Sequence, residues 1–370
     1  MSTPTLTQYL AQSRTKTDHK AIDLVVMGNE ACDLDSMVSS IVLAYTMAAK
    51  QQNGCCIPLL PIKRGDFRLR PEAVDLFKLA KIDLQPLVFL DDIEPDGFMA
   101  RTKNIILVDH NQLSRAFESH GPKISMILDH HKDQGLYPQA KKTIQAVGSC
   151  ATLVGERLIK KHPELVAPCP GLLLLGAILL DTVNLDPKAG RVTPKDKAMA
   201  AALAKFSPSG LTPFFNHLQS TRFSTKDLSS FDLLKRDYKA YGFKDFRWGI
   251  GSALVCLEAW EKRENNLGLA FESYARSKNL DLLGCMIAYK AQGFHRQMVL
   301  YAKNGAVHDG VVRFLEKKLD FEPYTLKHKI GGLNGKISFY AQKNLEISRK
   351  KLAPILETYF KLIIRPKSGE

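Results

Sequence analysis

The stretch IDLVVMGNEACDLDSMVSSIVLAYTMAAK, residues 22–50, decides the fold class. Its first residues, 22–27, form a short apolar run that predicts a buried strand. Residues 37–50 have apolar side chains at helical spacing, so we expect a helix there. A strand followed at once by a helix is the repeating unit of an α/β sheet.

Short apolar runs continue to alternate with helical stretches further along the chain. The runs are 56–60, 87–90, 105–108 and 124–128. This alternation predicts a doubly wound, mostly parallel sheet. In such sheets ligands bind at the carboxyl ends of the strands. We therefore look for chemistry in the residues that follow each run.

The composition is that of a globular protein with a real core. The chain has 370 residues, 45% hydrophobic and 24% charged, which is enough for two domains. The longest apolar run, 171–180, is well short of the ~20 residues of a membrane span, so no membrane insertion is expected. The N-terminus lacks the apolar stretch of a signal peptide. Seven cysteines without a C-x-x-C pair argue against disulfides and zinc, and predict a cytoplasmic protein.

Charge divides the chain unevenly, which suggests where its domains lie. Residues 1–210 carry 25 Lys and Arg against 22 Asp and Glu, whereas residues 211–370 carry 27 against 16. The segment SPSGLT, 207–212, has linker composition, so we predict domains at 1–206 and 213–370. The second domain mixes strands with helices, an α+β pattern. Its excess of 11 positive charges predicts an anionic partner, and nucleic acid, a membrane surface and polyphosphate all fit.

Metal-binding residue types follow the predicted strands. Asp33 and Asp35 follow the first strand, and DHN (109–111) and DHH (129–131) follow the fourth and fifth. Asp181 ends the apolar helical run 171–180. Carboxylates and imidazoles suit magnesium, manganese or cobalt, and shared carboxylates can hold two metal ions. The alternative is that Asp35 or Ser36 only caps the helix that follows.

Four motifs, in order, resemble those of the DHH phosphoesterases. They are GNEACDLDS (28–36), VDHN (108–111), LDHH (128–131) and GAILLDTVNL (176–185). The resemblance continues through VGSCATL (147–153), KRDYK (235–239) and ISRKK (347–351), so it covers nearly the whole chain. It implies an N-terminal DHH domain, a smaller DHH-associated domain and an active site in the cleft between them.

Two positions separate the branches of this family. Family II pyrophosphatases carry histidine where this chain has Asn29, which favours the exopolyphosphatase and prune branch. Animal prune proteins tend to have arginine at the last position of D-H-H, where this chain keeps His131. The resemblance therefore implies an exopolyphosphatase that removes the terminal phosphate of inorganic polyphosphate, short chains included, by two-metal in-line attack of water.

The resemblance also implies a role for each site residue. One divalent metal ion would be held by Asp35, Asp109, His130 and Asp181, and a second by Asp33 and Asp109. The implied substrate contacts are Asn29, His131, Lys239, Arg349 and Lys350. The implied catalytic residues are Asp109, His130, His131 and Arg349. Asn29 takes the place of a metal ligand in the pyrophosphatases, but its amide is a weaker donor than imidazole.

Alternatives of other classes remain at this point. One is a phosphohydrolase acting at the same site on cyclic nucleotides, nucleoside tetraphosphates or pyrophosphate. Another is a prune-like interaction protein with vestigial catalysis. Nucleic-acid binding is not expected, because no basic stripe interleaved with aromatic residues is present. We expect no obligate protein partner, and a polyphosphate-storing organelle is the alternative to the cytoplasm.

Overall fold

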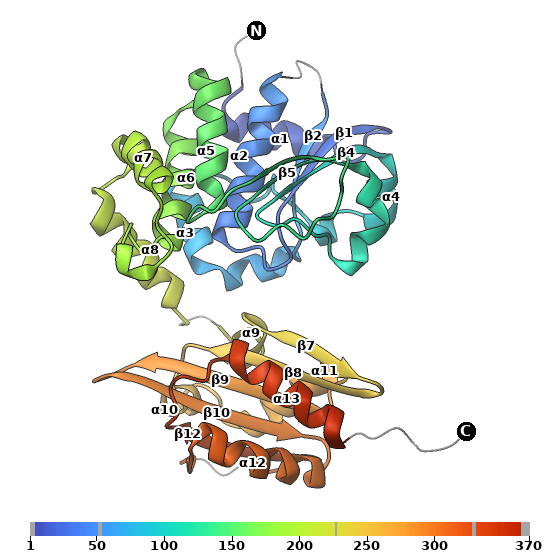
Figure 1. Ribbon diagram of the computed structural model, residues 1–370, viewed down its shortest axis with the longest axis vertical. Helices are drawn as coiled ribbons and strands as arrows, with labels where there is room; N and C mark the ends of the chain where they lie inside the picture. Colours follow the sequence, from blue (N-terminus) through green and yellow to red (C-terminus); the bar gives the residue numbers. More distant parts are fainter. Residues whose placement is uncertain (1–3, 51–53, 226–227, 328–330, 364–370) are drawn as a thin grey trace. The chain divides into compact units, whose positions relative to one another are not determined.

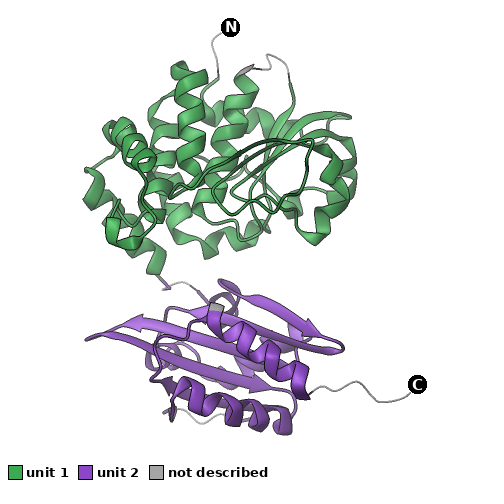
Figure 2. Ribbon diagram, in the orientation of Figure 1, with its two compact units in different colours: residues 1–224 green, residues 225–370 purple. Residues whose placement is uncertain are grey.

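The computed structural model describes residues 4–50, 54–225, 228–327 and 331–363. The chain forms two compact units, residues 1–224 and 225–370 (Figure 2). The division falls after the stretch 207–212, which we predicted to be the linker. That stretch leads into helix α8, Leu211–Phe223, whose buried Phe214 and Leu218 belong to the core of the first unit. The two compact units therefore divide after α8, while the linker at 207–212 stays a prediction.

The first unit is built on a six-stranded sheet in the order β3-β2-β1-β4-β5-β6. All neighbouring strands are parallel, which confirms the predicted parallel sheet. The strands are β1 (Ile22–Met27), β2 (Cys56–Leu60), β3 (Val88–Phe89), β4 (Thr102–Val108), β5 (Ile124–Asp129) and β6 (Lys141–Ile144).

Both faces of this sheet are covered, because successive strand residues point to opposite sides. Leu24 and Val26 of β1 join a large core with most of the helices, whereas Val25 and Met27 join a smaller core with α4 and η3 (Figure 1). The helices are α1 (Leu6–Thr15), α2 (Leu34–Lys50), α3 (Pro71–Leu79), α4 (Pro95–Arg101), α5 (Cys150–Lys161), α6 (Pro168–Asp181), α7 (Pro194–Leu203) and α8. Short 3-10 turns are η1 (Arg64–Leu69), η2 (Leu90–Asp92), η3 (Arg115–Lys123), η4 (Pro163–Leu165), η5 (Pro187–Ala189) and η6 (Ala204–Phe206).

The second unit is a mixed sheet in the order β11-β12-β10-β9-β8-β7. Strands β8 and β9 are parallel and the other pairs are antiparallel. Separate cores on its two faces contain α9 to α11 and α12 with α13, the expected α+β arrangement (Figure 1). The strands are β7 (Lys239–Phe243), β8 (Phe246–Ala253), β9 (Leu282–Lys290), β10 (Phe294–Ala302), β11 (Phe321–Pro323) and β12 (Lys336–Gln342). The helices are α9 (Ser230–Lys235), α10 (Leu257–Glu261), α11 (Leu267–Ser277), α12 (Gly305–Leu319) and α13 (Arg349–Ile363).

Helix α6 is the most apolar helix of the first unit. Its interior is fully buried in the core, and its 14 residues fall short of the ~20 that a membrane span needs. Within the described ranges, none of the helices has the length and apolar character required to cross a membrane. All seven cysteines are free thiols.

Candidate metal centre

The site lies where the sheet order reverses direction. Strand β1 pairs with β2 on one side and with β4 on the other, so the loops that follow β1 and β4 diverge and leave a crevice at their carboxyl ends. Asp33 and Asp35 follow β1, Asp109 follows β4, and His130 and His131 follow β5. Residues from distant parts of the sequence thus converge at this edge, as predicted.

The loop after β1 is fixed by local contacts. The backbone N–H of Asn29 donates to Ser36 Oγ at 2.7 Å, and a Cβ on Gly28 would overlap that oxygen. Asp33 Oδ1 accepts from the backbone N–H of Ser36 at 3.1 Å, so Asp33 caps helix α2. The cap is therefore Asp33 and not Asp35 or Ser36, which the alternative named, because Asp35 already lies within the first turn of the helix.

Asp35 is buried, with 3% of its surface exposed. Its carboxylate accepts the backbone N–H groups of Cys150 at 2.6 Å and Ala151 at 2.7 Å, at the start of α5. A helix N-terminus favours negative charge at this position. Burial nevertheless raises the pKa of Asp35, and the nearby Asp33 carboxylate raises it further. The Asp35 carboxylate is therefore held in place, but the positive charge around it does not balance its negative charge.

Asp109 occupies the centre of the cluster in a left-handed backbone conformation, with φ of 62°. Asn29 Nδ2 donates to its Oδ2 at 2.7 Å. Among the described residues its Oδ1 is buried without a hydrogen bond, and it lies 3.1 Å from His130 Nε2. Burial first, and the charge of Asp35 second, raise the pKa of Asp109 to about 8. A buried carboxylate oxygen without a donor is what a metal ligand looks like before the ion is added.

His130 is oriented for coordination. Its Nδ1 lies 2.9 Å from the carbonyl oxygen of Val147, so the Nδ1 proton is donated there and Nε2 faces Asp109 and Asp35. Burial lowers the pKa of His130, but the contact with Asp109 and the charge of Asp35 outweigh burial and raise it to about 10. The position at Nε2 is therefore strongly cation-seeking, whether for a proton or for a metal ion.

His131 is the exposed member of the pair, with 58% of its side chain accessible. Its Nδ1 donates to Asp129 Oδ1 at 2.8 Å, a contact that raises the pKa of His131. Asp129 is fully buried and also accepts from Asn111 Nδ2 at 2.5 Å. We did not predict a role for Asp129, although it is the first letter of the D-H-H motif. It sets the orientation of His131.

Asp181 ends α6 and faces the same cluster. Burial raises its pKa well above the ordinary range, and the carboxylates of Asp35, Asp33 and Asp109 raise it further. Three residues with left-handed φ values of 51° to 60° follow it, 183–185, so the chain turns sharply after this side chain. Asp181 is thus near enough to these carboxylates for their charge to raise its pKa, and its role as a metal ligand stays a prediction.

This donor set fits divalent metal ions. Three carboxylates with raised pKa values, a fourth carboxylate beside them and an oriented imidazole need positive charge between them. Oxygen and imidazole donors suit magnesium, manganese or cobalt. The ligand atoms of Asp109, His130 and His131 all lie within 4.8 Å of one another. The residues that would hold metal are Asp33, Asp35, Asp109, His130 and Asp181, with His131 within reach of the same position.

Asn29, which we predicted to contact the substrate, also has contacts within the protein. Its Nδ2 donates to Asp109, and its Oδ1 accepts from the backbone N–H of Cys32 at 3.0 Å. Both ends of the amide are engaged within the protein. Asn29 therefore positions Asp109, and its contact with substrate stays a prediction.

Buried Asp196 supports the site from behind. It accepts from Gly148 N at 2.8 Å, Thr152 Oγ1 at 2.6 Å and the hydroxyl of Thr193 at 2.7 Å. These bonds fix the segment that presents Cys150 and its neighbour to Asp35. The sequence indicates only the contact of Asp196 with Thr193, through the Thr-x-x-Asp capping box of α7. It does not indicate the long-range contacts.

We expect Asp196→Ala to lower the free energy of unfolding by about 3 kcal/mol, because several buried donors lose their acceptor at once. Urea denaturation measures this difference. Asp83→Ala, at an exposed position that caps only a local turn, is the matched control and is expected to change stability by less than ~0.5 kcal/mol. Equal stability of the two variants would contradict the supporting role of Asp196.

The second unit brings its own predicted residues together. Arg349, at the start of α13, pairs through Nη2 with Asp237 Oδ1 at 2.7 Å. Lys239 lies two residues after Asp237 in the sequence and is exposed at the start of β7. The KRDYK and SRKK motifs thus meet in space, although they are far apart in the sequence. The predicted side chain of Lys350 lies outside the described residues.

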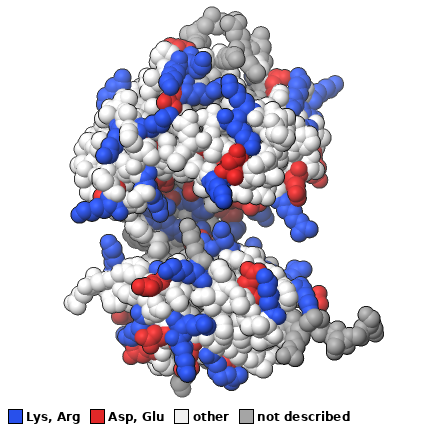
Figure 3. Space-filling view, in the orientation of Figure 1, with Lys and Arg blue, Asp and Glu red and all other residues white. Residues whose placement is uncertain are grey.

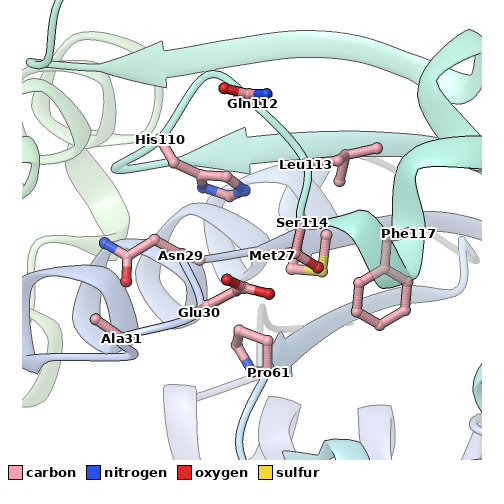
Figure 4. A pocket seen from close by; sticks show the side chains of 11 residues that line it. Met27, Asn29, Glu30, Ala31, Pro61, His110, Gln112, Leu113, Ser114 and Phe117 are labelled. Carbon is pink, nitrogen blue, oxygen red and sulfur yellow. The ribbon is translucent and has the colours of Figure 1, made fainter. Parts of the chain in front are cut away.

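A pocket of about 370 Å³ opens beside the metal centre, at the ends of β1, β2 and β4. Figure 4 shows Asn29 and Ala31 on one side of it and Leu113 and Phe117 on the other. Its lining includes Glu30 and contains no lysine or arginine. The pocket is therefore unsuited to a polyanion, and we did not predict it from the sequence.

Comparison with known proteins gives the same two-part division. Residues 23–177 match the family model described as the DHH family, N-terminal domain, and residues 216–359 match the DHHA2 domain. The chain is 35% identical to a putative exopolyphosphatase of Schizosaccharomyces pombe, over 90% of this chain and 89% of the relative. It is 31% identical to the human exopolyphosphatase PRUNE1, over 90% and 74%.

Pyrophosphatases are more distant relatives. A manganese-dependent inorganic pyrophosphatase of Methanocaldococcus jannaschii is 28% identical over 71% of this chain and 81% of the relative. The solved structure of a putative family II inorganic pyrophosphatase from Methanococcus jannaschii shares the fold, with a TM-score of 0.57 and 24% identity over 90% of this chain and 98% of that one.

Proposed function

Since the chain belongs to the DHH family, in the branch of exopolyphosphatases and prune proteins, we propose that it is a metal-dependent exopolyphosphatase. It would release the terminal phosphate from inorganic polyphosphate in the cytoplasm. The observation that carries the proposal is the buried, unbonded Oδ1 of Asp109, which faces His130 beside an intact His131. The names of the relatives support phosphoric anhydride hydrolysis, and manganese in one of them supports a divalent ion.

The chain's own residues have separate tasks in this proposal. Asp35, Asp109, His130 and Asp181 would hold one metal ion, and Asp33 would share Asp109 in holding a second. Divalent ions bound there supply a water nucleophile near neutral pH and offset the charge of the phosphoryl oxygens. Asn29 keeps Asp109 oriented throughout.

His131 is the proton donor of the proposal. Asp129 accepts from its Nδ1 and favours the protonated ring, which leaves Nε2–H to donate to an oxygen of the substrate. Lys239 and Arg349 would bind substrate phosphates, arginine through its planar fork and lysine as a point charge. Asp237 holds Arg349 in a fixed orientation.

The decisive test is phosphate release from tripolyphosphate, long polyphosphate, pyrophosphate and cyclic AMP, with magnesium, manganese or cobalt. We expect metal-dependent release from the two polyphosphates. His131→Ala should lower the rate by about 10²–10³-fold, because a positioned acid is lost. The matched control is His162→Ala, whose imidazole pairs with Glu164 away from the site and which should keep full activity.

Other outcomes would redirect the proposal. Faster cleavage of pyrophosphate than of polyphosphate would assign the chain to the pyrophosphatase activity despite Asn29. Release from cyclic AMP alone would favour the alternative phosphohydrolase. No turnover of any substrate with any of the metals would refute the proposed enzymatic activity. The prune-like interaction protein would then be the remaining alternative.

A further inference from the structure

One edge of the second sheet gathers the ends of four strands. Strands β8 and β9 are parallel, with Ala253 opposite Ile287, so they end together. Strand β7 is antiparallel to β8 and therefore begins at this edge, with Lys239 opposite Ile250. The hairpin that joins β9 to β10 also lies here. Lys239, one of the proposed phosphate contacts, marks this edge.

Arg349 lies at the same edge. Its partner Asp237 accepts through its carbonyl oxygen from the backbone N–H of Ser252, near the end of β8. At the far end of α13, Phe360 packs against Trp248 near the start of β8. Helix α13 therefore runs antiparallel to β8, and its first residue comes back to the edge where β8 ends.

A second arginine, Arg296, is held at this edge by three contacts. It is half-buried at the start of β10, opposite Ala288 on one side and Gln342 on the other. Its Nε donates to the carbonyl oxygen of Leu345 at 2.9 Å, and its guanidinium lies 5.0 Å from the centre of the Phe294 ring. Leu345 belongs to the turn that leads into Arg349.

These contacts leave the outer nitrogens of Arg296 available. Within the described residues its Nη1 and Nη2 have no hydrogen-bond or ion-pair partner. An arginine that is held by its Nε and stacked on an aromatic ring loses little freedom when it binds, and its remaining N–H groups match the oxygens of phosphate. Figure 3 shows many Lys and Arg side chains over the visible face of the second unit, so charge alone does not locate a site. The contacts of Arg296 locate the candidate site.

We propose that Arg296 binds phosphate groups of a polyphosphate chain beyond those held by Arg349, and so sets the preference for chain length. The proposal rests on the proposed function for its substrate. A chain bound at Arg349 has Arg296 on the same edge, and a long chain offers more phosphates to this edge than tripolyphosphate does. Arg296 is thus a subsite residue and touches no reacting atom.

The test compares Arg296→Gln with Arg247→Gln in the full chain. Arg247 is exposed on β8 at the opposite end of the sheet, where its backbone N–H donates to Asp281. We expect Arg296→Gln to raise KM for long polyphosphate about three- to fivefold, with kcat and KM for tripolyphosphate unchanged. Arg247→Gln should leave both substrates unaffected. Arg296→Lys, which keeps the charge and loses the fork, should fall between wild type and Arg296→Gln.

Direct binding separates this proposal from the proposed function. Titration calorimetry of long polyphosphate into the protein in EDTA should show about three- to fivefold weaker binding by Arg296→Gln, whether or not the wild type hydrolyses it. An equal loss in Arg247→Gln would mean that only diffuse charge acts. Unchanged binding in Arg296→Gln, or the same rise in KM for both chain lengths, would overturn the subsite.

Discussion

Asp109→Asn is expected to reduce metal-dependent phosphate release by about 10³-fold, the upper end of what the loss of one electrostatic group costs. Asp109 is the carboxylate with the unbonded buried oxygen, and it is the residue shared by both proposed metal positions. An amide keeps the shape of the side chain but removes the charge that a divalent ion needs. Phosphate release from tripolyphosphate with manganese measures the effect.

The same variant should fold at least as well as the wild type when metal is absent. Burial raises the pKa of Asp109 to about 8, so the charged carboxylate is unfavourable there and a neutral amide relieves it. Bound manganese, counted by equilibrium dialysis, should fall together with activity. This combination separates loss of a ligand from loss of structure.

Asp91→Asn is the matched control, because Asp91 also follows a strand of this sheet. It accepts from the backbone N–H of Arg64 in an exposed loop, away from the cluster. We expect its activity to equal that of the wild type. Retention of more than a tenth of wild-type activity in Asp109→Asn would contradict the role of Asp109 as a ligand.

The sheet could be predicted because its strands are locally apolar. The expected runs 22–27 and 56–60 coincide with β1 and β2. The edge strand Lys141–Ile144 was missed, because it is short and polar and only its pairing with β5 makes it a strand. The compact units divide after α8 rather than at the predicted linker for a related reason. Which core the side chains of α8 join is decided by packing, and composition signals only the turn before it.

The convergence of the candidate metal ligands could be predicted because the carboxyl ends of parallel strands meet at one edge. The residues that orient them could not. Asn29 turns inward to Asp109, Asp129 holds His131, and Asp196 ties two distant segments together. Each of these roles depends on a hydrogen bond between positions far apart in the chain. A sequence motif shows that such a residue is present, but it does not identify the hydrogen-bond partner of that residue.

Stability of the metal-free protein is expected to fall as pH rises from about 6 to about 8. Burial, with the charge of Asp35, raises the pKa of Asp109 from 3.8 to about 8. Burial opposes a rise at His130, but Asp109 and Asp35 outweigh it and raise its pKa from 6.5 to about 10. Across this range the folded state therefore binds more protons than the unfolded chain.

The sign follows from that difference. A group whose pKa is raised by folding contributes its stability in full below the unfolded pKa, and it loses that contribution as pH rises through the folded pKa. For Asp109 the loss runs from its ordinary pKa up to about 8, and for His130 it runs from 6.5 up to about 10. The two losses overlap near neutral pH and have the same direction. Each full proton of difference changes the unfolding free energy by about 1.4 kcal/mol per pH unit.

Metal ions should reverse this trend, because they replace the protons that the cluster otherwise takes up. Urea denaturation at pH ~6 and pH ~8, with EDTA and with manganese, measures both states, and we expect manganese to add more stability at the higher pH. Asp109→Asn should flatten the pH dependence in EDTA and weaken the response to manganese. Metal-free protein that becomes more stable between these two pH values would contradict the raised pKa values, and with them the view that this cluster is built to hold cations.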